Sequence, residues 1–125
     1  MKVLLPLAAL ALFTVPVHAA CTYPTAPTTL PDGATATKEE MIAAQKLVKK
    51  FDEEINAYTA CIKLEEDAQL AKGGTKLTPE QKSAIEQQQA QKNNAAVDDD
   101  QKLADRFNEQ IRIFKAKGSA PATKG

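Results

Sequence analysis

The apolar residues between Met41 and Ile62 constrain the fold more than any other feature of this sequence. They recur at alternating spacings of three and four residues, which places them along one face of an α-helix in a heptad pattern. A stripe of this length needs a second helix to cover it. The pattern therefore predicts a long helix that packs against another helix through Met41, Ala44, Val48, Phe51, Ile55, Tyr58 and Ile62.

Both ends of this helix carry sequence signals. Thr37-Lys38-Glu39-Glu40 fits a capping box, in which the Thr37 hydroxyl accepts from the Glu40 amide and the Glu40 carboxylate accepts from the Thr37 amide. Glycine is common just after a helix, and Gly73-Gly74 supplies it here. We therefore predict a first helix over about residues 38–71.

A second helix begins at Thr78-Pro79-Glu80-Gln81. Threonine is a good N-cap, and proline fits the first helical position because its missing N–H would have no partner there. No Gly or Pro follows until Gly118, so we predict a helix over 79–117 and a short flexible tail over 118–125. The polar residues around Asn94 could divide this helix, but we expect it to be continuous.

Folding the chain back at Gly73-Gly74 pairs positions whose numbers sum to about 151. Val48 then faces Leu103, and Ile55 faces Ala96. The expected fold class is all-α, an antiparallel hairpin of two long helices over residues 37–117 with an extended, Pro-rich N-terminal strap. Its core seam is predicted to contain Met41, Val48, Phe51, Ile55, Leu103, Phe107, Ile111 and Phe114.

The same register places polar residues opposite two apolar ones near the closed end of the hairpin. Tyr58 faces Asn93, and Ile62 faces Gln89. We therefore expect Tyr58 and Ile62 to be incompletely covered. Exposed apolar side chains that polar residues surround are typical of a partner-binding surface. The sequence thus nominates a partner or client face formed by Tyr58, Ile62, Gln89 and Asn93.

The first residues have the pattern of an export signal. Lys2 precedes an apolar stretch, and Val17-His18-Ala19 has the small-x-small spacing that signal peptidase requires. We therefore expect residues 1–19 to be removed near Ala19, and the protein to be periplasmic or secreted. No later stretch is apolar enough for a transmembrane helix.

Residues 20–36 are expected to form the extended strap. Pro24, Pro27 and Pro31 disfavour helix, and Pro31-Asp32-Gly33 is a turn signal. The strap is long enough to run back along the first helix, on the edge that carries Leu47, and to join the two cysteines, Cys21 and Cys61, in a disulfide.

Two alternatives for the cysteines remain open. Cys21 could be a lipid-modified N-terminus, although His18 stands where a lipobox has a Leu-like residue. The cysteines could also join two chains.

Composition argues against catalysis. The chain has one histidine, His18, which leaves with the signal, so the exported protein has no Ser-His-Asp or Cys-His machinery. Removing Lys2 from the 16 basic residues leaves 15 against 16 acidic ones, which gives no field to attract nucleic acid. Asp98-Asp99-Asp100 point about 100° apart on a helix and cannot converge on a cation. We expect a non-enzyme with no cofactor and no metal.

Leu77-Thr78-Pro79-Glu80-Gln81 resembles the LTxxQ motif of the Spy and CpxP periplasmic proteins, which are small, all-helical and dimeric. This resemblance implies that Leu77, Thr78 and Gln81 are structural, and that unfolded clients would meet an apolar face elsewhere. The match covers five residues of 125, and the motif occurs once, whereas those proteins typically carry it twice.

These observations favour a non-catalytic interaction module of the cell envelope, alone or as a homodimer. Its partner would be a protein or an unfolded client. A Spy-like general chaperone and an inhibitor or immunity-type protein for one secreted enzyme are the alternatives.

Overall fold

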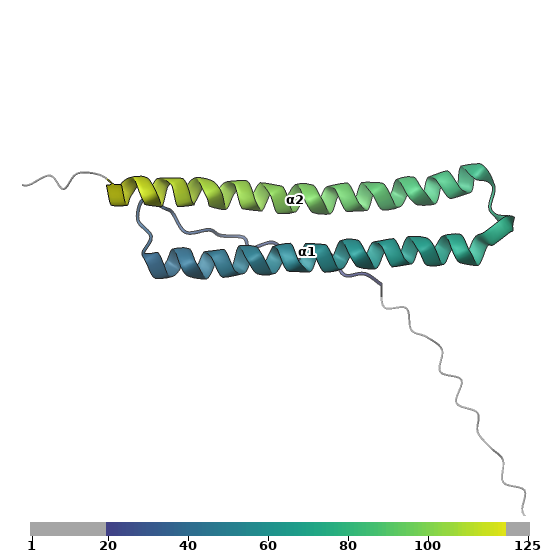
Figure 1. Ribbon diagram of the computed structural model, residues 1–125, viewed down its shortest axis with the longest axis horizontal. Coiled ribbons are helices and arrows are strands. Elements are labelled where there is room, and N and C mark those ends of the chain that lie inside the picture. Colours follow the sequence, from purple (N-terminus) through teal and green to yellow (C-terminus); the bar gives the residue numbers. More distant parts are fainter. Residues whose placement is uncertain (1–19, 120–125) are drawn as a thin grey trace, which may run out of the picture.

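The computed structural model describes residues 20–119 and is all-α over that range, as predicted. Helix α1 spans Lys38–Gly73, a 3-10 turn η1 spans Gly74–Lys76, and helix α2 spans Pro79–Ser119. The two long helices lie side by side and run in opposite directions (Figure 1). The predicted signal segment 1–19 and residues 120–125 of the predicted tail lie outside the described residues.

The helix starts follow the local chemistry of the sequence. The Thr37 hydroxyl accepts from the Glu40 amide and the Glu40 carboxylate accepts from the Thr37 amide, which confirms the capping box. Thr78 and Gln81 repeat the arrangement at α2. Gly74 has a φ of 50°, a conformation that glycine adopts without strain, and it caps α1.

Helix α2 is continuous through Asn93 and Asn94, which confirms the prediction of one unbroken helix. Residues 118 and 119 were predicted to belong to the tail, and this is wrong, because both lie in α2. A glycine near a helix end costs only about 1 kcal/mol relative to alanine, too little to end a helix of this length.

The core forms two neighbouring clusters between the helices. One contains Phe51, Ile55, Tyr58, Ile62, Ala96 and Leu103, and the other contains Ala36, Met41, Ala44 and Phe107. Val48, Ile111 and Phe114 of the predicted seam are half-buried at the edge of these clusters. Ala36 and the half-buried Leu30 come from the strap, so the core has a third contributor besides the two helices.

The strap is tied to both helices. Cys21 and Cys61 form the predicted disulfide, with their Cα atoms 5.8 Å apart, and the Cys21 amide donates to Glu65 of α1 at 3.1 Å. The Tyr23 hydroxyl donates to Asp99 of α2 at 2.6 Å. At the other end of the strap, Lys117 of α2 donates to the Ala36 carbonyl at 2.7 Å.

This path differs from the predicted one. We expected the strap to cover the edge of α1 that carries Leu47, but the Leu47 side chain is 51% exposed. The strap starts on the predicted edge, where residues 22–25 lie beside Glu54 and Cys61. It then lies over the groove between the helices, because α2 supplies hydrogen-bond partners for Tyr23, Gly33 and Ala36. It therefore acts as a third layer on one side of the helix pair.

A tight turn lets the strap approach α2 closely. The Asp32 carbonyl accepts from the Thr35 and Ala36 amides, and the Asp32 carboxylate accepts from the Ala34 amide. The Gly33 amide donates to the Gln110 side chain at 2.8 Å. A β-carbon at Gly33 would lie 2.1 Å from the Gln110 carbonyl oxygen, so only glycine fits this contact.

We predict that loss of the disulfide destabilises the whole fold. The bridge closes a loop with a sequence separation of 40, and in the chain-entropy model such a loop stabilises the folded state by up to about 4 kcal/mol. The double variant Cys21→Ser/Cys61→Ser should lose about 2–4 kcal/mol in urea unfolding followed by circular dichroism. A reductant should reproduce this loss in the native chain and have no effect on the double variant. Unchanged melting after reduction would contradict a structural role for the strap.

A second prediction concerns Gly33. Gly33→Ala should destabilise the protein by about 1–3 kcal/mol, because the new β-carbon overlaps backbone atoms of α2 and the strap must move. Gly118→Ala is the matched control, since nothing lies within 4 Å of its β-carbon position. Thermal unfolding of both variants measures the difference. Equal melting temperatures would show that the strap does not depend on this approach.

Candidate functional site

The face nominated from the sequence is not exposed. Tyr58 is 8% exposed and Ile62 is 2% exposed, so the expectation that they are incompletely covered is wrong. Tyr23 of the strap packs edge-on against the Tyr58 ring, with centroids 5.0 Å apart. Ile62 lines a small hollow together with Gln89 and Lys92 of α2, which are half-buried. Sequence reasoning missed Tyr23, although its place beside Cys21 was a signal.

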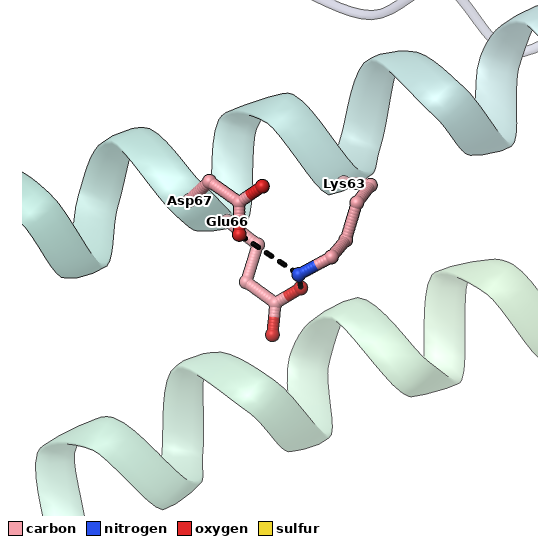
Figure 2. A network of polar contacts seen from close by, with 3 residues as sticks. All are labelled: Lys63, Glu66 and Asp67. Atoms are coloured by element: carbon pink, nitrogen blue, oxygen red, sulfur yellow. Dashed lines mark hydrogen bonds and ion pairs between the residues drawn. The ribbon is translucent and has the colours of Figure 1, made fainter.

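Polar side chains gather near the closed end of the helix pair, beside the buried Ile62. Glu66 points from α1 toward α2, and Lys63 donates to Glu66 at 3.1 Å and to Asp67 at 2.8 Å (Figure 2). Hydrogen bonds to Asp67 and Glu66 raise the pKa of the Lys63 amine. Lys92 of α2 lies 4.0 Å from Glu65 of α1. Of these contacts, only the one between Lys92 and Glu65 joins the two helices.

The side of the helix pair away from the strap carries a different surface, which we call the open groove. It is lined by Ile42, Gln45, Lys46, Val48, Lys49, Asp52, Asp100, Ala104, Phe107, Asn108 and Ile111. The strap contacts α2 at Asp99 and Gln110, and the groove uses Asp100 and Ile111, the next residues along the chain. Neighbouring helical residues point about 100° apart, so the two sets face different sides.

Apolar side chains are accessible along this groove. Ile42 is 43% exposed, and Val97, one heptad before Ala104 on α2, is 38% exposed. Val48 and Ile111 are half-buried beside them. Within residues 20–119, no segment covers these side chains as the strap covers the other side.

Two carboxyl groups face each other across the groove. Partial burial raises the pKa of the Asp100 carboxyl, and the Asp52 carboxylate raises it further. The ion pairs among the described residues include neither aspartate. Lys46 and Lys49 line the same groove, so it presents charged side chains of both signs beside apolar ones.

Of the consecutive residues Asp98, Asp99 and Asp100, the last two lie on different sides of the structure. The Asp99 carboxylate accepts a hydrogen bond from the Tyr23 hydroxyl on the strap side. Desolvation, and after it this hydrogen bond, raises the pKa of Tyr23 to about 12. Asp100 faces the open groove. Their side chains do not converge on one point, in agreement with the helical geometry.

Within residues 20–119, Cys21, Cys61 and Glu65 offer ligand atoms that all lie within 4.8 Å of one another. The two sulfurs are joined in the disulfide, and metal ions bind thiolates rather than disulfides. This group therefore has a structural role. The Glu65 carboxylate accepts a hydrogen bond from the Cys21 amide and so fixes the end of the strap.

Comparisons with known proteins give no relative from which a function can be transferred. No family model, no curated protein and no solved structure matches this chain. The resemblance to Spy and CpxP proteins therefore stays a prediction. Among the described residues, no helix combines the length and the apolar character that a membrane span requires.

The Asp52–Asp100 pair predicts a pH dependence of stability. The folded-state pKa of Asp100 is raised, so the folded state holds more protons than the unfolded state once the pH exceeds the unfolded value of about 3.9. The stability from this group is full below that value and is lost as pH rises through the folded pKa. Asp100→Asn should therefore raise the melting temperature at pH 7 and change it little at pH 3.5.

The difference in melting temperature between wild type and Asp100→Asn is measured by circular dichroism from pH 3.5 to pH 7. This difference separates the effect of the Asp52–Asp100 pair from that of the other carboxylates. Those at Glu40, Glu80 and Glu109 have lowered pKa values and act in the opposite direction. A variant less stable than wild type at pH 7 would contradict repulsion between the two aspartates.

Proposed function

We propose that this chain is an exported, non-catalytic protein-interaction module of the cell envelope, and that its helical hairpin binds a protein partner in the open groove. The single observation that carries this proposal is the asymmetry of the helix pair. The strap covers one side through the disulfide and its contacts with α2. Within residues 20–119 the other side has no such cover, and Ile42 in the groove is 43% exposed.

The groove has the character of a recognition surface. It combines apolar side chains, such as Val48 and Ile111, with charged and polar side chains of both helices. Interfaces between proteins commonly combine an apolar centre with a polar rim. The helices that form the groove are anchored by the core and the strap, so the surface is preorganised and loses little conformational freedom on binding.

Sequence chemistry supports binding over catalysis. The only histidine, His18, lies within the predicted signal, and Cys21 and Cys61 are joined in the disulfide. A disulfide is typical of an exported protein, in accord with the signal pattern at residues 1–19. No residue set in the open groove pairs a nucleophile with a base.

The test places a photo-crosslinking amino acid at position 108, inside the groove, or at position 64, on an exposed part of α1. We expect position 108 to give one discrete crosslinked product with envelope extract, position 64 to give none, and Ile42→Gln to abolish the product. Equal products from both positions would overturn the assignment of the groove.

A parallel aggregation assay on unrelated unfolding proteins separates a dedicated partner from a general chaperone. A module with one partner should give no protection, with oxidised or with reduced chain. Broad protection near stoichiometric ratios would overturn the dedicated-partner reading and favour the Spy-like alternative. Size-exclusion chromatography with light scattering shows whether a second copy of this chain is the partner.

A further inference from the structure

The side of α1 that borders the open groove carries a row of residues whose charges complement themselves. The row advances by alternating steps of three and four positions and consists of Ile42, Gln45, Lys49, Asp52, Asn56 and Thr59. Its first four members line the open groove, and all six are exposed except Thr59, which is half-buried. Rows with this spacing form the surface on which another helix packs. At the centre of the row a lysine is followed by an aspartate, so an antiparallel copy of the row presents them in the opposite order.

An antiparallel copy of α1 fits this row best when facing positions sum to 101. Lys49 then faces Asp52 of the copy, and Asp52 faces Lys49 of the copy. The outer positions of the row join two amides and two side chains with methyl groups, namely Gln45 with Asn56 and Ile42 with Thr59. Opposite charges that face each other across an interface fix its register.

Other arrangements of two copies bring like charges together or leave charges unpaired. An antiparallel sum of 98 sets Lys49 against Lys49, and a sum of 104 sets Asp52 against Asp52. A parallel pairing of α1 with its copy does both. A shift by a whole heptad sets Lys49 against an uncharged residue. Placing α1 over α2 of the copy, about an axis along the helices, sets Asp52 against Asp100, because facing positions then sum to about 151 as they do within one chain. Like charges that meet across an interface are costly.

A second copy supplies a cation where one chain has two acidic groups. Asp52 and Asp100 face each other across the groove, and the ion pairs among the described residues include neither. Lys49 of the same chain lies 3.9 Å from Glu53 instead. In the antiparallel register that sums to 101, Lys49 of each chain faces the acidic pair of the other.

The other charges near the row fit the same register. The positions of Lys46 and Glu53 sum to 99, so each lies within two residues of its opposite charge on the copy. Beyond the row, Lys38 faces Lys63 of the copy. Repulsion at this end is weak, because Lys63 is already paired with two carboxylates of its own helix. The opposite charges at the centre of the row therefore decide the register.

The register also matches apolar residues of α2, which had no part in choosing it. Within one chain, facing positions of α1 and α2 sum to about 151, as for Ile55 and Ala96 in the core. A twofold axis that gives 101 for α1 therefore gives about 201 for α2 and its copy. Val97 then lies beside Ala104 of the copy, and Ala104 beside Val97 of the copy. The contact covers Val97, which is 38% exposed in the single chain.

We propose that two copies of this chain pack groove to groove as an antiparallel pair, in which Lys49 of each chain binds Asp52 of the other. The four helices form a bundle in which α1 contacts its copy and α2 lies beside its own copy. The inference rests on the proposed interaction function and identifies the protein partner of the open groove as a second copy of this chain.

Charge exchange tests the pairing of Lys49 with Asp52. The oxidised chain, residues 20–125, is measured by analytical ultracentrifugation, and we expect a dimer. Lys49→Glu and Asp52→Lys each set like charges against each other at both reciprocal contacts, so each alone should weaken the dimer at least tenfold. An equimolar mixture of the two variants restores opposite charges at both contacts. Its dissociation constant should return to about that of the native chain.

Lys50→Glu is the matched control. Lys49 and Lys50 each pair with the glutamate four positions further on, at 3.9 Å and 3.4 Å, but Lys50 lies on the strap side. The control variant should therefore leave the dissociation constant unchanged. Circular dichroism shows whether each variant keeps its fold, and recovery of the dimer in the mixture excludes misfolding as the cause of its loss.

The outcomes separate this inference from the proposed function. A dimer of equal stability in all variants, or a mixture that associates no more tightly than its components, would overturn the pairing of Lys49 with Asp52. A native chain that stays monomeric would overturn the second copy. The proposed function would then stand if position 108 still gave a discrete crosslinked product with envelope extract. A monomeric chain without that product would overturn both.

Discussion

The strap, pinned at Cys21 and at Ala36, is the interaction on which the rest of the structure depends. Two helices packed only on each other leave both flanking grooves open and bury little apolar surface. Here the disulfide and the Lys117 contact hold a third layer over one groove. That layer completes both core clusters through Leu30 and Ala36. A molecule with only two helices therefore acquires two chemically different sides.

The contrast between the two ends of the helix pair follows from the reach of this layer. Among residues 20–119, the strap begins beside Cys61, and between Cys61 and Gly74 no third layer covers the two helices. In that part the interior contains Glu66, and Lys63 neutralises its charge from the same helix. An unpaired carboxylate there would be costly. At the closed end, Lys92 of α2 also lies 4.0 Å from Glu65 of α1, so polar groups of both helices accompany the buried Ile62.

Local chemistry made much of the fold predictable from the sequence. The Thr37 and Thr78 caps and the heptad stripe each depend on residues within a few positions of one another. The path of the strap could not be predicted, because the Gly33–Gln110 contact joins residues separated by 77 positions and requires α2 to be in place already. For the same reason Tyr58 was assigned to an exposed face. Its cover, Tyr23, comes from a segment that shows no periodicity.

The pairing of Asp52 with Asp100 in the open groove also could not be predicted from the sequence pattern. Asp52 and Asp100 are ordinary solvated residues in sequence, and only the antiparallel register sets them together. Selection for stability alone would favour an amide at one position, since an amide removes the repulsion and donates a hydrogen bond to the remaining carboxylate. Two carboxyl groups that oppose each other beside exposed Ile42 and Val97 therefore cost stability in the isolated chain.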